Sequence, residues 1–163
     1  MAADTAPNTR LIRFFAVAGL ITAVALSGSA VTTPQIPGWY QGLAKPFWTP
    51  PNGLFPIAWT TLYALMGVAL LRLWGKPPQT PGRTRAIVLF LAQLALNAAW
   101  SPVFFGLQAP WPALAIIVLL IATLALAIKA AREVDKIAAW LLLPYLAWLC
   151  YASTLNAAIA VMN

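Results

Sequence analysis

Aromatic and amide side chains recur at helical spacing in three apolar stretches of this chain. The three sets are Phe55, Trp59 and Tyr63; Gln93, Asn97, Trp100 and Phe104; and Trp148, Ala152 and Leu155. Residues three and four apart share one face of an α-helix, so each set predicts a stripe on one helix. Aromatic surface with a few orienting polar groups is typical of a pocket that binds a small hydrophobic molecule. The alternative is that Gln93 and Asn97 only join neighbouring helices by hydrogen bonds.

The side chains available for catalysis are few. The chain has no His, which excludes a Ser-His-Asp triad and His-ligated zinc or haem. Its one cysteine, Cys150, lies inside the last apolar stretch, where we expect a small buried packing residue rather than a reactive thiol. The acids Asp4, Glu133 and Asp135 fall in the N-terminal tail and the last loop, so an ion-coupled carrier would lack its usual intramembrane carboxylate. We therefore predict no metal site and no required cofactor.

The tryptophans divide into two groups by their position. Five fall in loops or near the ends of apolar stretches, where indoles commonly anchor a chain at the membrane interface: Trp39, Trp48, Trp74, Trp111 and Trp140. Trp59, Trp100 and Trp148 fall inside the stretches. An indole N–H at that depth needs a partner, so such a side chain faces a neighbouring helix or a cavity. These three are the stronger candidates for a site.

Membrane-spanning helices must position these side chains. Hydrophobic residues make up 62% of the 163 residues and charged residues only 8%, which is more apolar surface than a soluble domain of this size can bury. Stretches of about the length that a bilayer core requires predict five spans. They are residues 11–32, 54–74, 86–105, 113–128 and 137–162. The predicted fold is an all-α membrane protein, a five-helix bundle that forms a single domain over residues 1–163.

The basic residues set the predicted orientation. Of the ten Lys and Arg residues, all but Lys45 flank the spans on one side, near the N-terminus and around the second and fourth loops. The positive-inside rule then places the N-terminus in the cytoplasm, and the first loop and the C-terminus on the opposite side of a bacterial inner or outer membrane. The net charge of +7 indicates contact with lipid headgroups rather than nucleic acid, because the basic residues lie between apolar spans.

The first span has a second interpretation. Arg10 and Arg13, the apolar stretch from Phe14 and the small residues at 28–30 also fit a cleavable signal peptide. Its removal would leave four spans and would take away the helix that anchors the first loop. Mass spectrometry of the mature N-terminus distinguishes the two interpretations.

The first loop, residues 33–53, is predicted to be an ordered lid. Its run Trp39–Pro51 reads W-Y-Q-G-L-A-K-P-F-W-T-P-P. Prolines fix φ and aromatic rings supply contact area, unlike the Gly/Ser-rich or charged composition of a flexible linker. Pro34 and Pro37 are expected to close the first span. Lys45 is the only cation on this side, and we expect it to speed the capture of anionic ligands.

Four segments resemble the TspO/MBR family of tryptophan-rich sensory proteins, which includes the mitochondrial translocator protein, or peripheral benzodiazepine receptor. They are the lid run above, F-P-I-A-W-T-T-L-Y-A-L-M-G from Phe55, A-L-N-A-A-W-S-P-V-F-F-G from Ala95, and P-Y-L-A-W-L-C-Y-A-S-T-L-N from Pro144. Four blocks in the same order are a specific signal, and the resemblance covers nearly the whole chain.

This resemblance implies a five-helix bundle, often a homodimer, that binds porphyrins and other planar or sterol-like ligands in a cavity beneath the first loop. The ligand contacts implied by the matching motif positions are Phe47, Trp48, Phe55, Ala58, Trp59, Tyr63, Asn97, Trp100, Leu119, Trp148, Ala152 and Leu155. Trp39 and Lys45 belong to the lid, whereas Leu119 lies in a helix without a strong motif. Ala95 and Ala99 add a weak dimer signal, since small residues at this spacing are common in membrane helices.

The leading function implied is a membrane protein that binds porphyrins, such as protoporphyrin or haem, and senses, regulates or translocates tetrapyrrole intermediates. One alternative is light-dependent porphyrin breakdown, in which Trp59 and Trp148 take part in redox chemistry. Another is a membrane scaffold that binds ligands incidentally. Binding ranks first because no acid, base, metal or nucleophile in the sequence requires catalysis. Sterol specificity is not supported, because no basic residue follows Tyr145 or Tyr151.

Overall fold

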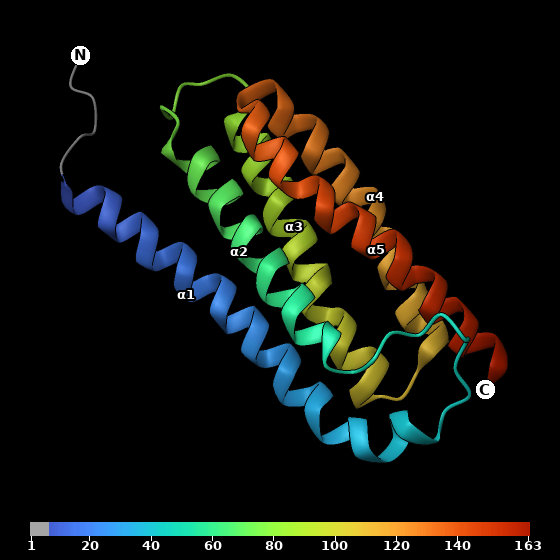
Figure 1. The fold of residues 1–163 in the computed structure, drawn as a ribbon. Helices are drawn as coiled ribbons and strands as arrows, with labels where there is room; N and C mark the ends of the chain where they lie inside the picture. The colour runs from blue at the N-terminus through green and yellow to red at the C-terminus, as the bar shows by residue number, and fades with distance from the viewer. Residues whose placement is uncertain (1–6) are drawn as a thin grey trace.

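The computed structural model describes residues 7–163, and within that range it is helical and contains no strand (Figure 1). Its main helices are α1 (Pro7–Thr32), α2 (Leu54–Gly75), α3 (Arg83–Ser101), α4 (Pro110–Val134) and α5 (Lys136–Met162). Each belongs to a helical segment that is long and apolar enough to cross a membrane. The predicted all-α, five-span membrane fold is confirmed. Asp4, which the sequence places in the N-terminal tail, lies outside the described residues.

The first helix continues beyond the predicted end of the first span. A 3₁₀ turn (Thr33–Gln35) and a π turn (Ile36–Tyr40) extend α1, with a kink at Gly38, where φ is −111° and ψ is −105°. The prediction that the prolines of this segment end the helix was wrong. Each proline lies in the first turn of its short segment, where its missing N–H costs no hydrogen bond. The helical conformation reaches residue 42, so the loop proper is residues 43–53 rather than 33–53.

The fourth helix is also longer than predicted. Its span was expected to end at Ile128, yet α4 runs to Val134, and only Asp135 separates it from α5. The charged residues of the segment 129–134 therefore lie on a helix and not in a loop. This segment has no Pro or Gly and consists mainly of good helix formers, so its polarity marks the edge of the membrane span rather than the end of the helix.

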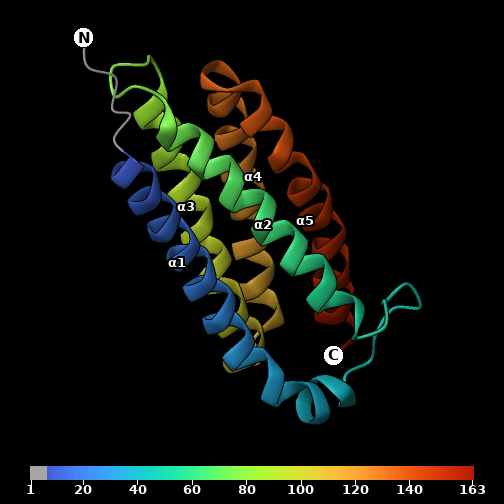
Figure 2. The ribbon, with the colours of Figure 1, turned by 60° about the vertical axis from the view of Figure 1, so that its left-hand side comes forward.

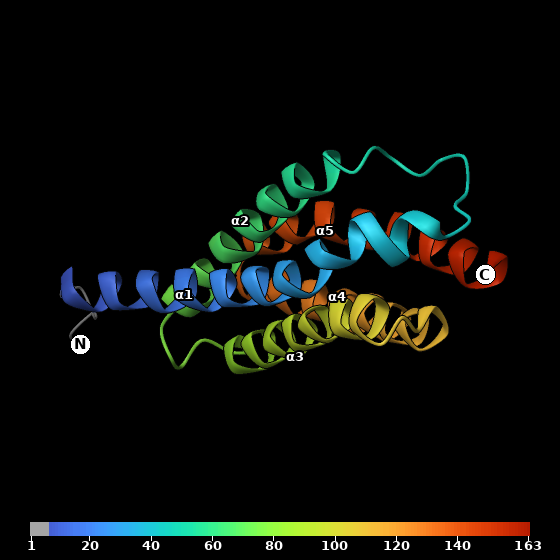
Figure 3. The same ribbon diagram turned by 90° about the horizontal axis from the view of Figure 1, so that it is seen from below.

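The helices pack into a bundle in which α1 lies against α2 and α3, α2 lies against α5, and α4 packs against both α3 and α5 (Figures 2 and 3). Val17 and Ile21 of α1 are buried and lie close to Gly67 of α2, so the first helix packs as part of the bundle. The start of α1, the connection between α2 and α3, and the junction of α4 with α5 share one end (Figure 1). The 43–53 loop and the C-terminus lie at the other end.

An ion cluster joins α2 to the start of α5 at the first of these ends. The buried Asp135 carboxylate accepts hydrogen bonds from Arg72 Nε (3.1 Å) and Nη2 (3.0 Å), and Lys76 Nζ lies 2.9 Å from Oδ2. It also caps α5 by accepting from the N–H of Ala138 at 3.0 Å. Burial alone would raise the pKa of Asp135. The hydrogen bonds from Lys76, Arg72 and Ala138 outweigh burial and hold this pKa well below its ordinary value.

Candidate ligand-binding site

Five aromatic side chains meet between α2 and α5. The ring centroid of Trp59 is 5.3 Å from that of Tyr63, 6.1 Å from that of Tyr145 and 6.5 Å from that of Trp148. Phe55 contacts Trp148 edge to face, with 6.0 Å between the centroids. Such contacts are favourable because the positive edge of one ring meets the negative face of another. We call these five rings the aromatic cluster.

A chain of hydrogen bonds adds polar atoms to the aromatic cluster. Tyr63 Oη donates to Asn97 Oδ1 at 2.9 Å, and Asn97 Nδ2 donates to Tyr145 Oη at 2.7 Å. Asn97 and Tyr145 are both buried. The chain joins α2, α3 and α5, so Asn97 links helices and at the same time holds two phenols in fixed positions. Tyr145 was missed by the sequence analysis, although its spacing of three from Trp148 puts both residues on one helical face.

Trp100 belongs to a neighbouring group. Its Nε1 donates to Asn156 Oδ1 at 3.1 Å, and Asn156 Nδ2 donates to the carbonyl of Pro110 at 2.8 Å. The Trp100 ring stacks on Phe104 at a centroid separation of 4.9 Å. The expectation that this indole N–H needs a partner is confirmed. Asn156 was missed by the sequence analysis. An amide inside the last span, next to Leu155, could have indicated a residue that needs hydrogen-bond partners on another helix.

Gln93 is the second amide of the predicted α3 stripe. It is completely buried, and its Nε2 lies 3.9 Å from the sulfur of Met66 on α2. Its Oε1 has no hydrogen-bond partner among residues 7–163. Gln93 therefore contacts a neighbouring helix through one end of its amide and leaves an acceptor unused at the other end.

The lid residues Phe47 and Trp48 lie at the end of the bundle that carries the 43–53 loop, and the side chain of Phe47 is turned outward. Phe47 is 96% exposed and Trp48 is 41% exposed. The backbone beneath them is held to α5 at two points. Tyr151 Oη donates to the carbonyl of Trp48 at 2.8 Å, and the side-chain amide of Asn163 bonds both the N–H (3.0 Å) and the carbonyl (3.1 Å) of Ala44. The loop is thus held to α5 through its backbone, while the side chain of Phe47 does not point into the bundle.

Lys45 and Trp39, also predicted for the lid, contact other parts of the chain. Lys45 Nζ donates to two carbonyls that precede it, at 3.2 and 2.9 Å, and lies 4.9 Å from the ring centroid of Tyr40. Trp39 packs edge-on against Phe104 and Phe105. Trp39 therefore anchors the extension of α1 on the π turn Pro102–Gly106 that follows α3, and it has no ring contact with the aromatic cluster.

A groove with a volume of about 520 Å³ runs along α2 and α5. We call it the α2–α5 groove. Its lining residues are Ala58, Thr61, Leu62, Leu65, Pro144, Ala147, Trp148 and Tyr151. Ala58, a predicted ligand contact, lies in this groove. Trp148 belongs both to the groove and to the aromatic cluster.

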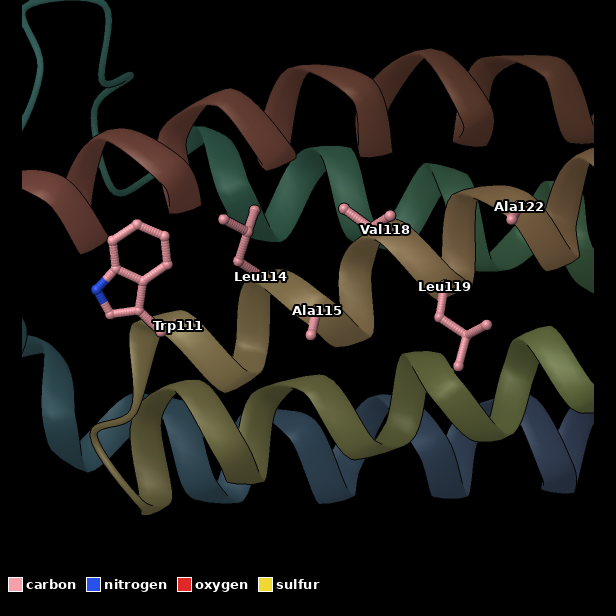
Figure 4. A pocket seen from close by; sticks show the side chains of 6 residues that line it. All are labelled: Trp111, Leu114, Ala115, Val118, Leu119 and Ala122. Carbon is pink, nitrogen blue, oxygen red and sulfur yellow. The ribbon is translucent and has the colours of Figure 1, made fainter.

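The remaining predicted contacts take three different positions. Ala152 is half-buried against the core, and Leu155 is buried. Leu119 is 55% exposed and lies in a second groove, also of about 520 Å³, on α4 (Figure 4). The residues of that groove are Trp111, Leu114, Ala115, Val118, Leu119 and Ala122. The structure therefore does not bring Leu119 together with the aromatic cluster.

The expectation that Cys150 is buried was wrong. Its side chain is exposed on the outer face of α5, whereas its neighbour Leu149 is 2% exposed. The sequence position of Cys150 predicts how deep it lies along the membrane span. It does not predict whether the side chain faces the bundle or the lipid, which depends on how α5 packs. In a membrane protein an outward thiol can lie in apolar surroundings without being buried in the protein.

The arrangement of side chains offers surfaces and polar atoms that can bind a planar molecule. Within residues 7–163, no group of three or more His, Cys, Asp and Glu side chains is placed to hold a metal ion. The aromatic cluster offers ring faces, and the Tyr63 and Tyr145 hydroxyls with the Asn97 amide offer hydrogen bonds in fixed directions. Ring faces bind planar apolar molecules, and fixed polar atoms orient them.

Comparison with known proteins places the whole bundle in a recognised group. The model of the TspO/MBR family matches residues 16–162. The chain is 40% identical to "Tryptophan-rich protein TspO" of Chlorobaculum tepidum, over 96% of this chain and 99% of that protein. It is 38% identical to "Tryptophan-rich sensory protein" of Cereibacter sphaeroides, over 83% and 85%. It is 42% identical to the human "Translocator protein", over 72% and 70%.

Proposed function

The chain belongs to the TspO/MBR family, and from that premise we propose that it binds tetrapyrroles and other planar hydrophobic molecules at the aromatic cluster. It is an integral, multi-pass membrane protein. The names of its relatives, sensory protein and translocator protein, support a role in sensing or moving a ligand within the membrane. In our proposal the ligand is a porphyrin such as protoporphyrin or haem, which the protein takes from the bilayer.

The observation that carries this proposal is the aromatic cluster with its hydrogen-bond chain. A planar macrocycle offers two broad apolar faces and a polar edge. Trp59 and Trp148 provide faces that stack on such a ring, and each stacked pair contributes about 0.5–1.5 kcal/mol beyond the burial of area. Asn97 and the two phenols that flank it supply donors and acceptors for the polar edge.

Entry of a ligand requires the rings to separate. Trp59 and Trp148 now contact each other at 6.5 Å, so a planar molecule that stacks between them replaces one aromatic contact by two. Trp148 is only half-buried, which leaves one side of its ring free to move. The ligand-bound and ligand-free states then differ mainly in the position of the Trp148 indole. A partner protein that contacts this indole can distinguish the two states.

We also propose that the protein forms a homodimer, with α3 as the contact surface. Ala95 and Ala99 lie four apart and are exposed on α3, where small side chains let two helices approach closely. The dimer is a separate matter from ligand binding, since the aromatic cluster lies between α2 and α5 of a single chain.

Titration of protoporphyrin, haem and a sterol against tryptophan fluorescence in detergent tests the binding proposal. We expect protoporphyrin to quench the fluorescence strongly, because Trp59 and Trp148 would lie against it. Trp59→Phe should weaken protoporphyrin binding about fivefold to tenfold, which corresponds to about 1–1.4 kcal/mol of lost stacking.

The matched control is Trp140→Phe, which removes an indole that is 70% exposed near the other end of α5. The affinity of Trp140→Phe for protoporphyrin should stay within twofold of that of the parent protein. Unchanged fluorescence with all three ligands would contradict the proposal and favour a scaffold role.

A further inference from the structure

We propose that the α2–α5 groove is a separate binding site for the planar ligand, which occupies the groove from the lipid side before it passes Trp148 into the aromatic cluster. This inference rests on the proposed function. It adds a route, a second site and a residue that separates the two sites.

The groove is shallow and open along its length, as expected of a site reached from the lipid side. On each helix four lining residues follow the spacing i, i+3, i+4, i+7, so each wall is one continuous stripe. The hollow arises where the side chains are small, at Ala58 on one wall and at Ala147 on the other. Its volume of about 520 Å³ falls within the range of small-molecule pockets.

Trp148 lies between the groove and the aromatic cluster. Its side chain lines the groove, and its ring also contacts Phe55 at 6.0 Å and Trp59 at 6.5 Å. In the proposed route, a change of side-chain rotamer at this residue turns its ring away from Phe55 and Trp59 and opens the groove toward the aromatic cluster.

The direct path from the aqueous end is obstructed by the lid. The backbone of the 43–53 loop is bonded to α5 at Trp48 and at Ala44. Opening this end breaks the bond from Tyr151 and the pair of bonds from Asn163. The groove needs no such opening, since its walls already face outward along α2 and α5.

The chemistry of the groove selects an uncharged planar surface. Its lining contains no ionisable acid or base that is charged at neutral pH. Thr61 Oγ1 donates to the carbonyl of Ile57 at 3.0 Å, and Tyr151 Oη donates to the carbonyl of Trp48 at 2.8 Å. Both hydroxyls keep lone pairs that can accept a hydrogen bond from a ligand N–H. Tyr151 lies at the loop end, so charged ligand substituents can stay near the membrane surface while the ring enters.

Stopped-flow quenching of tryptophan fluorescence by protoporphyrin, with protein and ligand in the same detergent micelles, tests this route. Ala147→Phe fills the groove without touching the hydrogen-bond chain of the cluster. We expect the association and dissociation rates both to fall tenfold or more. Thr61→Phe, on the opposite wall, is the second variant and should slow both rates in the same way.

The matched control is Ala115→Phe, which fills the groove on α4 and should leave both rates within twofold of the parent protein. Monodispersity and helical circular dichroism confirm that each variant is folded. The groove route would be overturned if Ala147→Phe and Thr61→Phe had the same association and dissociation rates as the control. The same result is expected if only a lipid chain or a second copy of the protein occupies the groove. Absence of quenching in the parent protein would instead overturn the proposed function, and the route with it.

Discussion

At the scale of single residues, the buried Asp135 carboxylate holds a charge that Arg72 and Lys76 stabilise. Asp135→Asn keeps the size of the side chain and an acceptor for the α5 cap, but it removes the negative charge between Arg72 and Lys76. We expect the free energy of unfolding at pH 7 to fall by about 1–3 kcal/mol, less than for a fully buried pair because both cations are more than a third exposed. Denaturant titration in detergent measures this loss.

The control is Glu133→Gln, which neutralises an exposed carboxylate two residues away and should change stability by less than about 0.5 kcal/mol. Equal losses in the two variants would show that Asp135 acts only through the overall charge of this end of the bundle.

The same carboxylate gives a pH dependence with a defined sign. The pKa of Asp135 is lower in the folded protein than in the unfolded chain, where it is about 4. Its contribution is therefore complete above about pH 5 and is lost as the pH falls through the unfolded value toward the folded one. The stability difference between the parent protein and Asp135→Asn, measured from pH 7 down to pH 3, should shrink over the acid part of this range. A difference that stays constant to pH 3 would contradict the assignment.

Residue types and spacing predicted which aromatic side chains share a helix face, and the structure brings Phe55, Trp59, Tyr63 and Trp148 together. Spacing could not say what each face meets. Asn97 donates a hydrogen bond to Tyr145 on α5, which is far away in sequence. Phe47 was expected to contact the ligand, yet its side chain is turned outward. Contacts of this kind depend on how each helix is rotated about its axis relative to its neighbours. The periodicity of a sequence gives the residues on one helix face but not this rotation.

At the scale of the elements, the 43–53 loop depends on bonds between its backbone and α5. Tyr151→Phe removes the hydrogen bond to the carbonyl of Trp48 and keeps the ring. We expect local opening of the loop to become easier by about 1 kcal/mol, or roughly fivefold. Hydrogen–deuterium exchange of residues 43–53 measures the change.

Ser153→Ala is the control for this variant, because its hydroxyl bonds only the carbonyl of Cys150 within α5. Exchange in the loop should match that of the parent protein. Faster exchange in the control, or no change in Tyr151→Phe, would show that the tether at Trp48 does not limit opening.

The ends of the elements were harder to predict than their number. The sequence predicts that the first span closes at Pro34 and Pro37 and that the fourth span ends at Ile128, but helical conformation runs through both prolines and continues to Val134. The two errors have different physical causes. A proline in the first turn of a helical segment loses no hydrogen bond, and a charged residue outside the bilayer is still a good helix former. Apolar length locates a span, whereas backbone hydrogen bonds locate the helix.

At the scale of the whole molecule, all basic residues except Lys45 gather at one end of the bundle, around the start of α1, the α2–α3 connection and the α4–α5 junction. We predict that this end faces the cytoplasm. In a Cys150→Ala background, Asn52→Cys in the loop should react with a membrane-impermeant maleimide from outside. Gln79→Cys, between α2 and α3, should react only after the membrane is made permeable. The reverse pattern would contradict the predicted orientation.

The extension of α1 has a consequence for the membrane itself. The helical segment Asn8–Tyr40 contains 33 residues, so it is about 50 Å long and exceeds the hydrocarbon core of a typical bilayer by about 20 Å. The apolar part, residues 11–32, is close to the core thickness, so the excess lies in the polar start and in the proline-containing end of the segment, which project beyond the core or are accommodated by tilt. The kink at Gly38 and the contact of Trp39 with Phe104 hold the projecting end against the bundle, so bilayer thickness bears directly on the segment that leads into the loop.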